Sequence, residues 1–423
     1  MSIIVFLVFI VGYLAIAFEQ PLKLNKAASA LFTGILCWTV YFLSGVEKPK
    51  AVQELFNSVS DISAILFFLL GAMAIVELIA LHNGFDLITQ KIKPKSKVKL
   101  LWIITIITFC LSAVLNNMTT AIVMTSLTAK LLKAKNDRLW FAGMIIIAAN
   151  AGGAFSPIGD VTTTMLWIGH QVTAGNIIAE LFLPALMVCI VPLVIISSKF
   201  RNATIEYKET EMLFIDRKAS YLILFSGIIL LLLVPLFKIL TGLPPFMGVL
   251  LALSILWMIV SAINYNKPPD KKKELTATHA LRNIDTPGLL FFLGILLAVS
   301  AIQSFGMLKQ VAVFLDHSLG NVYLIGSSLG VASAFISNVP LVAATQGMYH
   351  LSTYPTDHRL WEFIALTTGT GGSIIVFGSA AGIAAMGVEK IEFMWYLKKI
   401  SWIALVGFIA GILVFIGQKM IFQ

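Results

Sequence analysis

Long apolar runs, separated by short charged stretches, dominate the pattern of the chain. Runs of about 18–20 residues recur along its whole length, and each can cross a bilayer core of about 30 Å. The runs cover residues 2–18, 27–45, 62–81, 98–131, 138–169, 176–198, 219–237, 243–263, 287–303, 320–351, 359–387 and 399–417. This pattern predicts an all-α polytopic membrane protein.

Composition and charge agree with this interpretation. Hydrophobic residues make up 58% of the chain and charged residues only 12%, against about 25% charged in soluble domains. The first run has no basic segment or small-residue cleavage site, so we expect a retained span rather than a signal peptide. The basic residues that give the net charge of +9 lie between the spans. There they set topology, and we expect no nucleic-acid partner.

Four of the apolar runs are interrupted by polar residues, glycine or proline. The interruptions read LNNMTT (115–120), NAGGAFSPIGDVTTT (150–164), ISNVP (336–340) and TGTGGSIIVFGSAAG (368–382). Pro157 lacks an N–H and stops a helix. The glycines allow conformations that expose backbone groups. Each interruption therefore predicts a helix that ends at membrane depth.

The interruptions recur in the same order in the two halves of the chain. Asn117 is matched by Asn338 at an offset of 221, and three glycines of the second interruption are matched in the fourth. These glycine pairs are Gly152 with Gly371, Gly153 with Gly372 and Gly159 with Gly378. We infer an internal duplication, with a first repeat at 1–199, a cytoplasmic linker at 200–218 and a second repeat at 219–423.

Basic residues orient these repeats. KIKPKSKVK precedes the run 98–131 and KLLKAKNDR follows it, so both ends should be cytoplasmic. The run then forms a re-entrant hairpin with Asn116–Asn117 at its tip, and 320–351 forms its counterpart. Without its hairpin, each repeat crosses the membrane five times. Because five is odd, the second repeat has the opposite orientation to the first. An external N-terminus leaves six of the 30 Lys and Arg outside: Lys48, Lys50, Lys238, Lys309, Arg359 and Lys419.

Two inverted repeats, each with a re-entrant hairpin and a broken helix (138–169 and 359–387), are typical of secondary transporters. Asp160 lies in the first broken helix. An acid at membrane depth is costly and usually functional. The alternative is that Asp160 only caps the second half-helix, with Thr162 and Thr163 filling space.

The side chains at the interruptions indicate which ion would bind. Alkali cations prefer oxygen ligands, and the interruptions supply oxygen-bearing side chains but no Lys or Arg. An anionic substrate would usually recruit a cationic side chain, so the set favours a cation. The candidates are Asp160, Asn116, Asn117, Asn150, Asn338, Thr119, Thr120, Ser156, Thr162, Thr163, Ser337, Ser373 and Ser379.

Several stretches resemble NhaD-type sodium/proton antiporters of the ion transporter superfamily, which also holds arsenite permeases and divalent-anion/sodium carriers. The stretches are NAGGAFSPIGDVTTTMLWIG, LNNMTTAIV, ELIALHNGFD and ISNVPLVAA. The resemblance implies exchange of Na⁺ or Li⁺ for H⁺ in a bacterial inner membrane by a homodimer without cofactors. By motif it places Asp160, Thr162, Thr163, Asn117 and Thr119 first, with Ser337 and Asn338 on the opposite tip and Na⁺ at Asp160, Asn117 and Asn338.

Two further polar residues lie outside the interruptions. Glu77 lies near the cytoplasmic end of the run 62–81. It either extends to the membrane surface or serves a proton path or gate, and the resemblance favours the second role. His82 begins an amphipathic stretch and could sense pH, although we expect a solvated surface histidine. The linkers 199–218 and 264–286 should be solvated cytoplasmic loops.

Two rival functions remain. An intramembrane aspartyl enzyme needs a second acid at matched depth, and Glu77 lies near one surface. An anion permease of the same fold, for arsenite or a dicarboxylate, is the closer alternative. Dicarboxylate carriers have Ser-Asn-Thr at both tips, whereas this chain has Asn116-Asn117-Met118-Thr119 and Ser337-Asn338-Val339-Pro340. This departure disfavours a dicarboxylate.

Overall fold

The computed structural model describes residues 2–17, 24–90, 94–201, 203–205, 216–265, 275–335 and 337–422. These residues form helices joined by short loops, and their one β-bridge, Ser96 to Thr204, is isolated. Eight helices are long and apolar enough to cross a membrane. They span Lys26–Leu43, Lys48–Leu81, Lys97–Leu115, Ala174–Lys199, Arg217–Thr241, Pro245–Ile263, Thr286–Ser304 and Ser401–Ile421. The predicted all-α membrane fold is confirmed.

The helices of the first half run from the N-terminus to residue 199. They are α1 (Ser2–Ala17), α3 (Lys26–Leu43), α4 (Lys48–Leu81), α5 (Gly84–Gln90), α6 (Lys97–Leu115), α7 (Asn117–Leu131), α8 (Lys135–Ala154), α9 (Val161–Ile168) and α10 (Ala174–Lys199). The interruptions predicted within 98–131 and 138–169 separate α6 from α7 and α8 from α9.

The second half follows the same order at its hairpin and broken helix and contains additional short helices. Its helices are α11 (Arg217–Leu232), α12 (Val234–Thr241), α13 (Pro245–Ile263), α15 (Ala277–Asn283), α16 (Thr286–Ser304), α17 (Met307–Leu319), α18 (Val322–Phe335), α19 (Asn338–Met348), α20 (Arg359–Gly371), α21 (Ala380–Glu389), α22 (Phe393–Lys399) and α23 (Ser401–Phe422). The pairs α18–α19 and α20–α21 correspond to the predicted hairpin and broken helix. The repeat boundary at 200–218 stays a prediction, since residues 202 and 206–215 lie outside the described residues.

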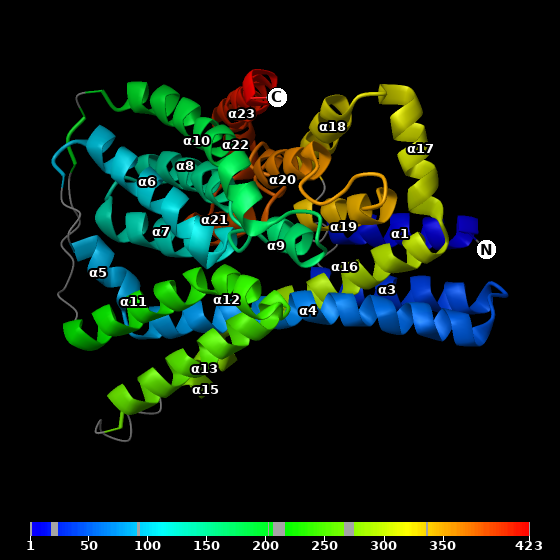
Figure 1. Cartoon of the computed structure of the whole chain (residues 1–423). Helices are drawn as coiled ribbons and strands as arrows, with labels where there is room; N and C mark the ends of the chain where they lie inside the picture. Colours follow the sequence, from blue (N-terminus) through cyan, green and yellow to red (C-terminus); the bar gives the residue numbers. More distant parts are fainter. Residues whose placement is uncertain are drawn as a thin grey trace.

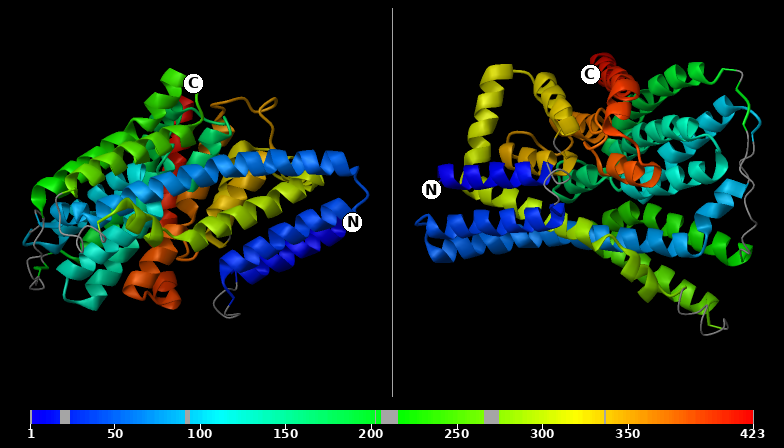
Figure 2. Two further views of the ribbon diagram at one scale, coloured as in Figure 1. Left: turned by 90° about the horizontal axis from the view of Figure 1, so that it is seen from below. Right: turned by 180° about the vertical axis from the view of Figure 1, so that it is seen from behind.

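The two hairpins enter the molecule from opposite sides. In Figure 1, α6 and α7 approach the centre from the left, whereas α18 and α19 approach it from the right. The view from behind in Figure 2 agrees. Near the centre, α7 packs against α21 and α9 packs against α19. Each hairpin therefore contacts the broken helix of the other half, as expected for inverted repeats.

The hairpin and the broken helix pack in the same way in both halves. Ser112 Oγ donates to the Ala149 carbonyl oxygen at 2.5 Å, and Ser333 Oγ donates to the Thr368 carbonyl oxygen at 3.1 Å. A Cβ at Gly152 would collide with the Phe109 carbonyl oxygen, and one at Gly371 would collide with the Gly330 carbonyl oxygen. Glycine at these matched positions lets the two backbones approach closely.

Some predicted boundaries were wrong. The run 62–81 belongs to α4, which begins at Lys48 because Pro49 is tolerated in a first turn. The run 219–237 divides between α11 and α12 at Leu233, just before Pro235. The stretch 264–286 is not simply a solvated loop, because it contains α15, whose Ala277 and Ala280 are buried.

Candidate functional site

Asp160 lies where the first broken helix meets the hairpin of the second half. Its side chain is 2% exposed. Oδ1 accepts a hydrogen bond from the Thr162 backbone N–H at 3.4 Å and so caps α9. Oδ2 accepts from Asn338 Nδ2, at the start of α19, at 3.1 Å. The capping role considered from the sequence is real, and it leaves the second oxygen facing the other half.

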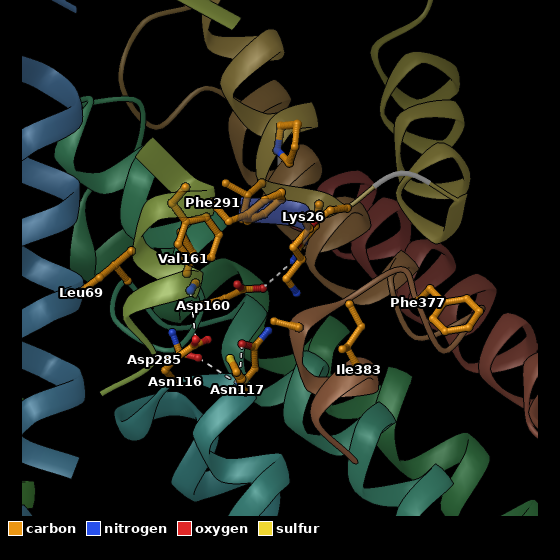
Figure 3. Close-up of a pocket in the computed structure, with 18 of the residues that line it drawn as sticks. Lys26, Leu69, Asn116, Asn117, Asp160, Val161, Asp285, Phe291, Phe377 and Ile383 are labelled. Carbon is orange, nitrogen blue, oxygen red and sulfur yellow. Dashed lines mark hydrogen bonds between the residues drawn. The ribbon is translucent and has the colours of Figure 1, made fainter. Parts of the chain in front are cut away.

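A cavity of about 390 Å³ opens beside this carboxylate. Figure 3 shows Asn117, Asp160 and Lys26 around it. Six of the residues predicted from the sequence line it: Asn116, Asn117, Thr119, Asp160, Ser337 and Asn338. Both hairpin tips and the first broken helix therefore converge on one space, although they are up to 222 positions apart in the chain.

The tip of the first hairpin holds an unusual backbone conformation. Asn116 has φ +74° and ψ 141° between α6 and α7, outside the left-handed helical region and in a conformation that residues other than glycine rarely adopt. Its Oδ1 accepts from the Met118 N–H at 3.0 Å. The Asn117 N–H donates to the Gly159 carbonyl oxygen at 3.0 Å. These bonds fix the tip against the break that precedes Asp160.

Two buried hydroxyls near the junction lack partners. Thr120 Oγ1 in α7 and Thr162 Oγ1 in α9 have no hydrogen-bond partner among the described residues. A buried polar atom without a partner is destabilising. Both threonines were predicted from the sequence, and neither is among the residues that line the cavity.

Other predicted residues support the backbone instead of lining the cavity. Ser156 Oγ donates to the Ala113 carbonyl oxygen at 2.5 Å, and Thr163 Oγ1 donates to the Asp160 carbonyl oxygen at 2.9 Å. Asn150 Nδ2 lies 2.8 Å from both Ser373 Oγ and Ser379 Oγ. The first two bonds hold the break in shape, and the last two join the first half to the second.

The sequence interpretation missed three ionisable side chains that line the cavity: Tyr13, Lys26 and Asp285. Lys26 Nζ lies 5.6 Å from the centre of the Phe291 ring. Asp285 Oδ1 caps α16 by accepting from the Gly288 N–H at 3.0 Å. All three lie near helix ends, where sequence patterns indicate topology rather than a site.

Glu77 and His82 do not line this cavity. Glu77 Oε1 accepts from Asn283 Nδ2 at 3.0 Å, and its role in a proton path stays a prediction. The expectation of a solvated His82 was wrong, because its side chain is only 4% exposed. Its Nδ1 lies 2.8 Å from the Leu78 carbonyl oxygen, and Ser220 Oγ of α11 donates to its carbonyl oxygen. The end of α4 is covered by α11, which removes His82 from solvent.

The ligand chemistry favours a monovalent cation over a transition metal. The described residues contain no group of three or more His, Cys, Asp or Glu side chains suited to a metal ion. Around the cavity beside Asp160 the oxygen atoms come from two carboxylates, Asp160 and Asp285, and from amides and hydroxyls, a hard set that suits alkali cations.

Comparison with known proteins identifies the family. A family model described as a citrate transporter matches residues 13–369. The chain belongs to this family of membrane transporters. Sodium/proton antiporter 1 of Arabidopsis thaliana is 44% identical over 413 residues, which cover 97% of this chain and 71% of the relative. The Na(+)/H(+) antiporter NhaD of Alkalimonas amylolytica is 27% identical over 440 residues, covering 96% and 88%. The predicted resemblance to NhaD-type antiporters is confirmed.

A solved structure supports the fold. The crystal structure of the Alcanivorax borkumensis YdaH transporter, described as having an unusual topology, matches with a TM-score of 0.57 at 12% identity. The match covers 92% of this chain and 97% of that one. At this identity the likeness concerns architecture and not substrate.

Proposed function

We propose that the chain exchanges Na⁺ or Li⁺ for H⁺ across its membrane, with Asp160 binding cation and proton alternately. The observation that carries this proposal is the buried carboxylate of Asp160 at the meeting point of both halves, with Asn338 donating a hydrogen bond to one of its oxygens. The printed names of the plant and bacterial relatives favour the same pair of ions.

Electrostatics explains how one carboxylate couples the two ions. A bare charge at membrane depth is costly, whereas a protonated or cation-paired carboxylate is nearly neutral. Asp160 would therefore cross between inward-facing and outward-facing states only with H⁺ or Na⁺ bound. With neither ion bound, Asp160 would not cross between the two states. Na⁺ therefore could not leak across the membrane without H⁺ moving in the opposite direction.

The two hairpin tips suit this scheme. Asn117 and Asn338 carry the same amide and both line the cavity beside Asp160. They begin α7 and α19, which enter the molecule from opposite sides (Figure 1). Each tip can then guard the route to one face of the membrane, as broken elements at the midplane do in other inverted-repeat transporters. The homodimer and the external N-terminus stay predictions. The bacterial inner membrane also stays a prediction, since similar proteins come from bacteria and from a plant.

An anion such as citrate is the second candidate, and Lys26 is the observation in its favour. The described lining residues include one cation, Lys26, and two carboxylates, Asp160 and Asp285. A tricarboxylate would meet more negative than positive charge there, and like charges repel strongly at low dielectric. The charge of the lining therefore favours a cation.

Reconstitution into proteoliposomes tests the proposal. With an acidic lumen and a pH-sensitive dye, external Na⁺ or Li⁺ should restore fluorescence as protons leave, whereas choline should not. Labelled citrate should not accumulate. Citrate uptake without any Na⁺-driven proton movement would overturn cation exchange and favour the anion.

A further inference from the structure

The two broken helices share a backbone geometry but not a chemistry. Asp160 has φ −138° and ψ 150°, and Ser379 has φ −137° and ψ 154°. Asp160 Oδ1 caps α9, and Ser379 Oγ caps α21 by accepting from the Gly382 N–H at 3.1 Å. Ser379 therefore occupies, in the second half, the place that Asp160 holds in the first.

A matched position in each half reaches across to the opposite break. In the first half this position is Asn150 of α8. The offset of 219 that relates Asp160 to Ser379 pairs Asn150 with Gly369 of α20. A Cβ at Gly369 would lie 3.7 Å from Asp160 Oδ2. Asn150 instead extends its amide to Ser379. The space beside the carboxylate is thus left without a side chain from α20, whereas the space beside the serine is filled from α8.

The Asn150 amide is held on three sides. The residue is 0% exposed. Nδ2 donates to Ser373 Oγ and to Ser379 Oγ, both at 2.8 Å, which uses both of its N–H groups. Oδ1 accepts from Asn117 Nδ2 at 3.1 Å. The two N–H groups carry partial positive charge and contact the hydroxyl oxygens of Ser373 and Ser379. A cation bound between these two serines would make the same contacts.

We propose that the Asn150 amide takes the place of a second cation, so that the chain binds one Na⁺, at Asp160. The proposal rests on the cation exchange proposed above and sets its binding stoichiometry. A cation at Ser379 would lack a countercharge, which is unfavourable in a buried site. Ser373 and Ser379, predicted as ion ligands, hold Asn150 instead.

Counting bound Na⁺ on the purified full-length chain tests this inference. Equilibrium binding of ²²Na⁺ should give one ion per parent chain. Asn150→Asp replaces the amide by a carboxylate of nearly the same shape between the same serines, and it should raise the count to two at mildly alkaline pH. Asn150→Gly copies Gly369 and should admit a second ion of lower affinity.

Two double variants assign the ions. Asn150→Asp with Ser379→Ala should weaken the second ion at least tenfold and keep the first. Asn150→Asp with Asp160→Asn should lose the first and keep the second. Two ions on the parent chain, or no second ion on either Asn150 variant that elutes as a monodisperse protein, would overturn the inference. A parent chain that binds no Na⁺ overturns the proposed exchange as well.

Discussion

The broken helix of the first half and that of the second half have the same architecture and different side chains. Both end against a hairpin where a glycine permits close contact, and both restart at a residue that caps the next half-helix. The first carries Asp160, Thr162 and Thr163 where the second carries Ser379, Ala381 and Gly382. The two breaks therefore share their packing, but only the first carries a charged side chain.

The hairpin tips differ much less. Asn117 and Asn338 begin α7 and α19, and both line the cavity. The two breaks differ in charge, whereas the two tips carry the same amide. This contrast indicates that the breaks and the tips have different roles. We infer that the tips serve both faces of the membrane alike, while the charge that binds the ion is needed once.

Removing the carboxylate should have the largest effect. Asp160→Asn keeps the shape and the cap but loses an attraction to Na⁺ of about 4 kcal/mol at a 4 Å separation. Na⁺ affinity should fall on the order of a thousandfold, and exchange in proteoliposomes should be abolished because the amide cannot carry the exchanged proton. Asp160→Glu keeps the charge one methylene out of place and should retain partial activity. Ser379→Ala, at the matched position of the other half, serves as the comparison, and an equal loss there would remove the asymmetry between the breaks.

The next largest effect should come from the tips. Asn338→Ala removes a side-chain carbonyl oxygen that we propose as a Na⁺ ligand. The loss is comparable to that of a hydrogen bond to a charged group, about 1.5–3 kcal/mol, so the Na⁺ concentration for half-maximal exchange should rise about tenfold or more. Asn117→Ala should act in the same direction. Asn57→Ala, an exposed asparagine of α4, is the control. Unchanged kinetics in both tip variants would make the tips purely structural.

The shared architecture predicts matched losses of stability. Gly152→Ala and Gly371→Ala each place a methyl group against a backbone carbonyl of the hairpin. Such overpacking costs about 1–3 kcal/mol, so both variants should melt at lower temperature by similar amounts. Gly387→Ala, where a Cβ meets nothing within 4 Å, is the control. If only one of the glycine pair were sensitive, the two halves would not share their packing.

The smallest effect should come from Glu77. Its carboxylate is hydrogen-bonded to Asn283 outside the cavity, and partly exposed charges contribute about 1 kcal/mol or less. Glu77→Gln should change the exchange rate less than about fivefold. A loss as large as that of Asp160→Asn would instead establish the proton path considered from the sequence.

The local breaks could be predicted from the sequence because their signals are local. Proline, paired glycines and adjacent asparagines interrupt apolar runs, and the repeated order of Asn117 and Asn338 exposes the duplication. The convergence of six predicted residues on one cavity follows from that symmetry. The assignment of the ion ligands within the set stays a prediction.

The rest of the site depends on contacts that no local pattern encodes. Lys26 and Asp285 reach the cavity because α3 packs against α16, elements more than 240 residues apart. Asn150 finds its serines 223 and 229 positions away. The burial of His82 likewise depends on α11, which begins 135 residues later.

Proton release on Na⁺ binding tests the central claim most directly. If both ions bind Asp160, each must weaken the binding of the other. Adding Na⁺ to the purified chain in weakly buffered detergent should release at most one proton per chain, over the pH range in which this carboxylate is partly protonated. Asp160→Asn should release none. Equal proton release from the parent and from Asp160→Asn would contradict competition at this carboxylate.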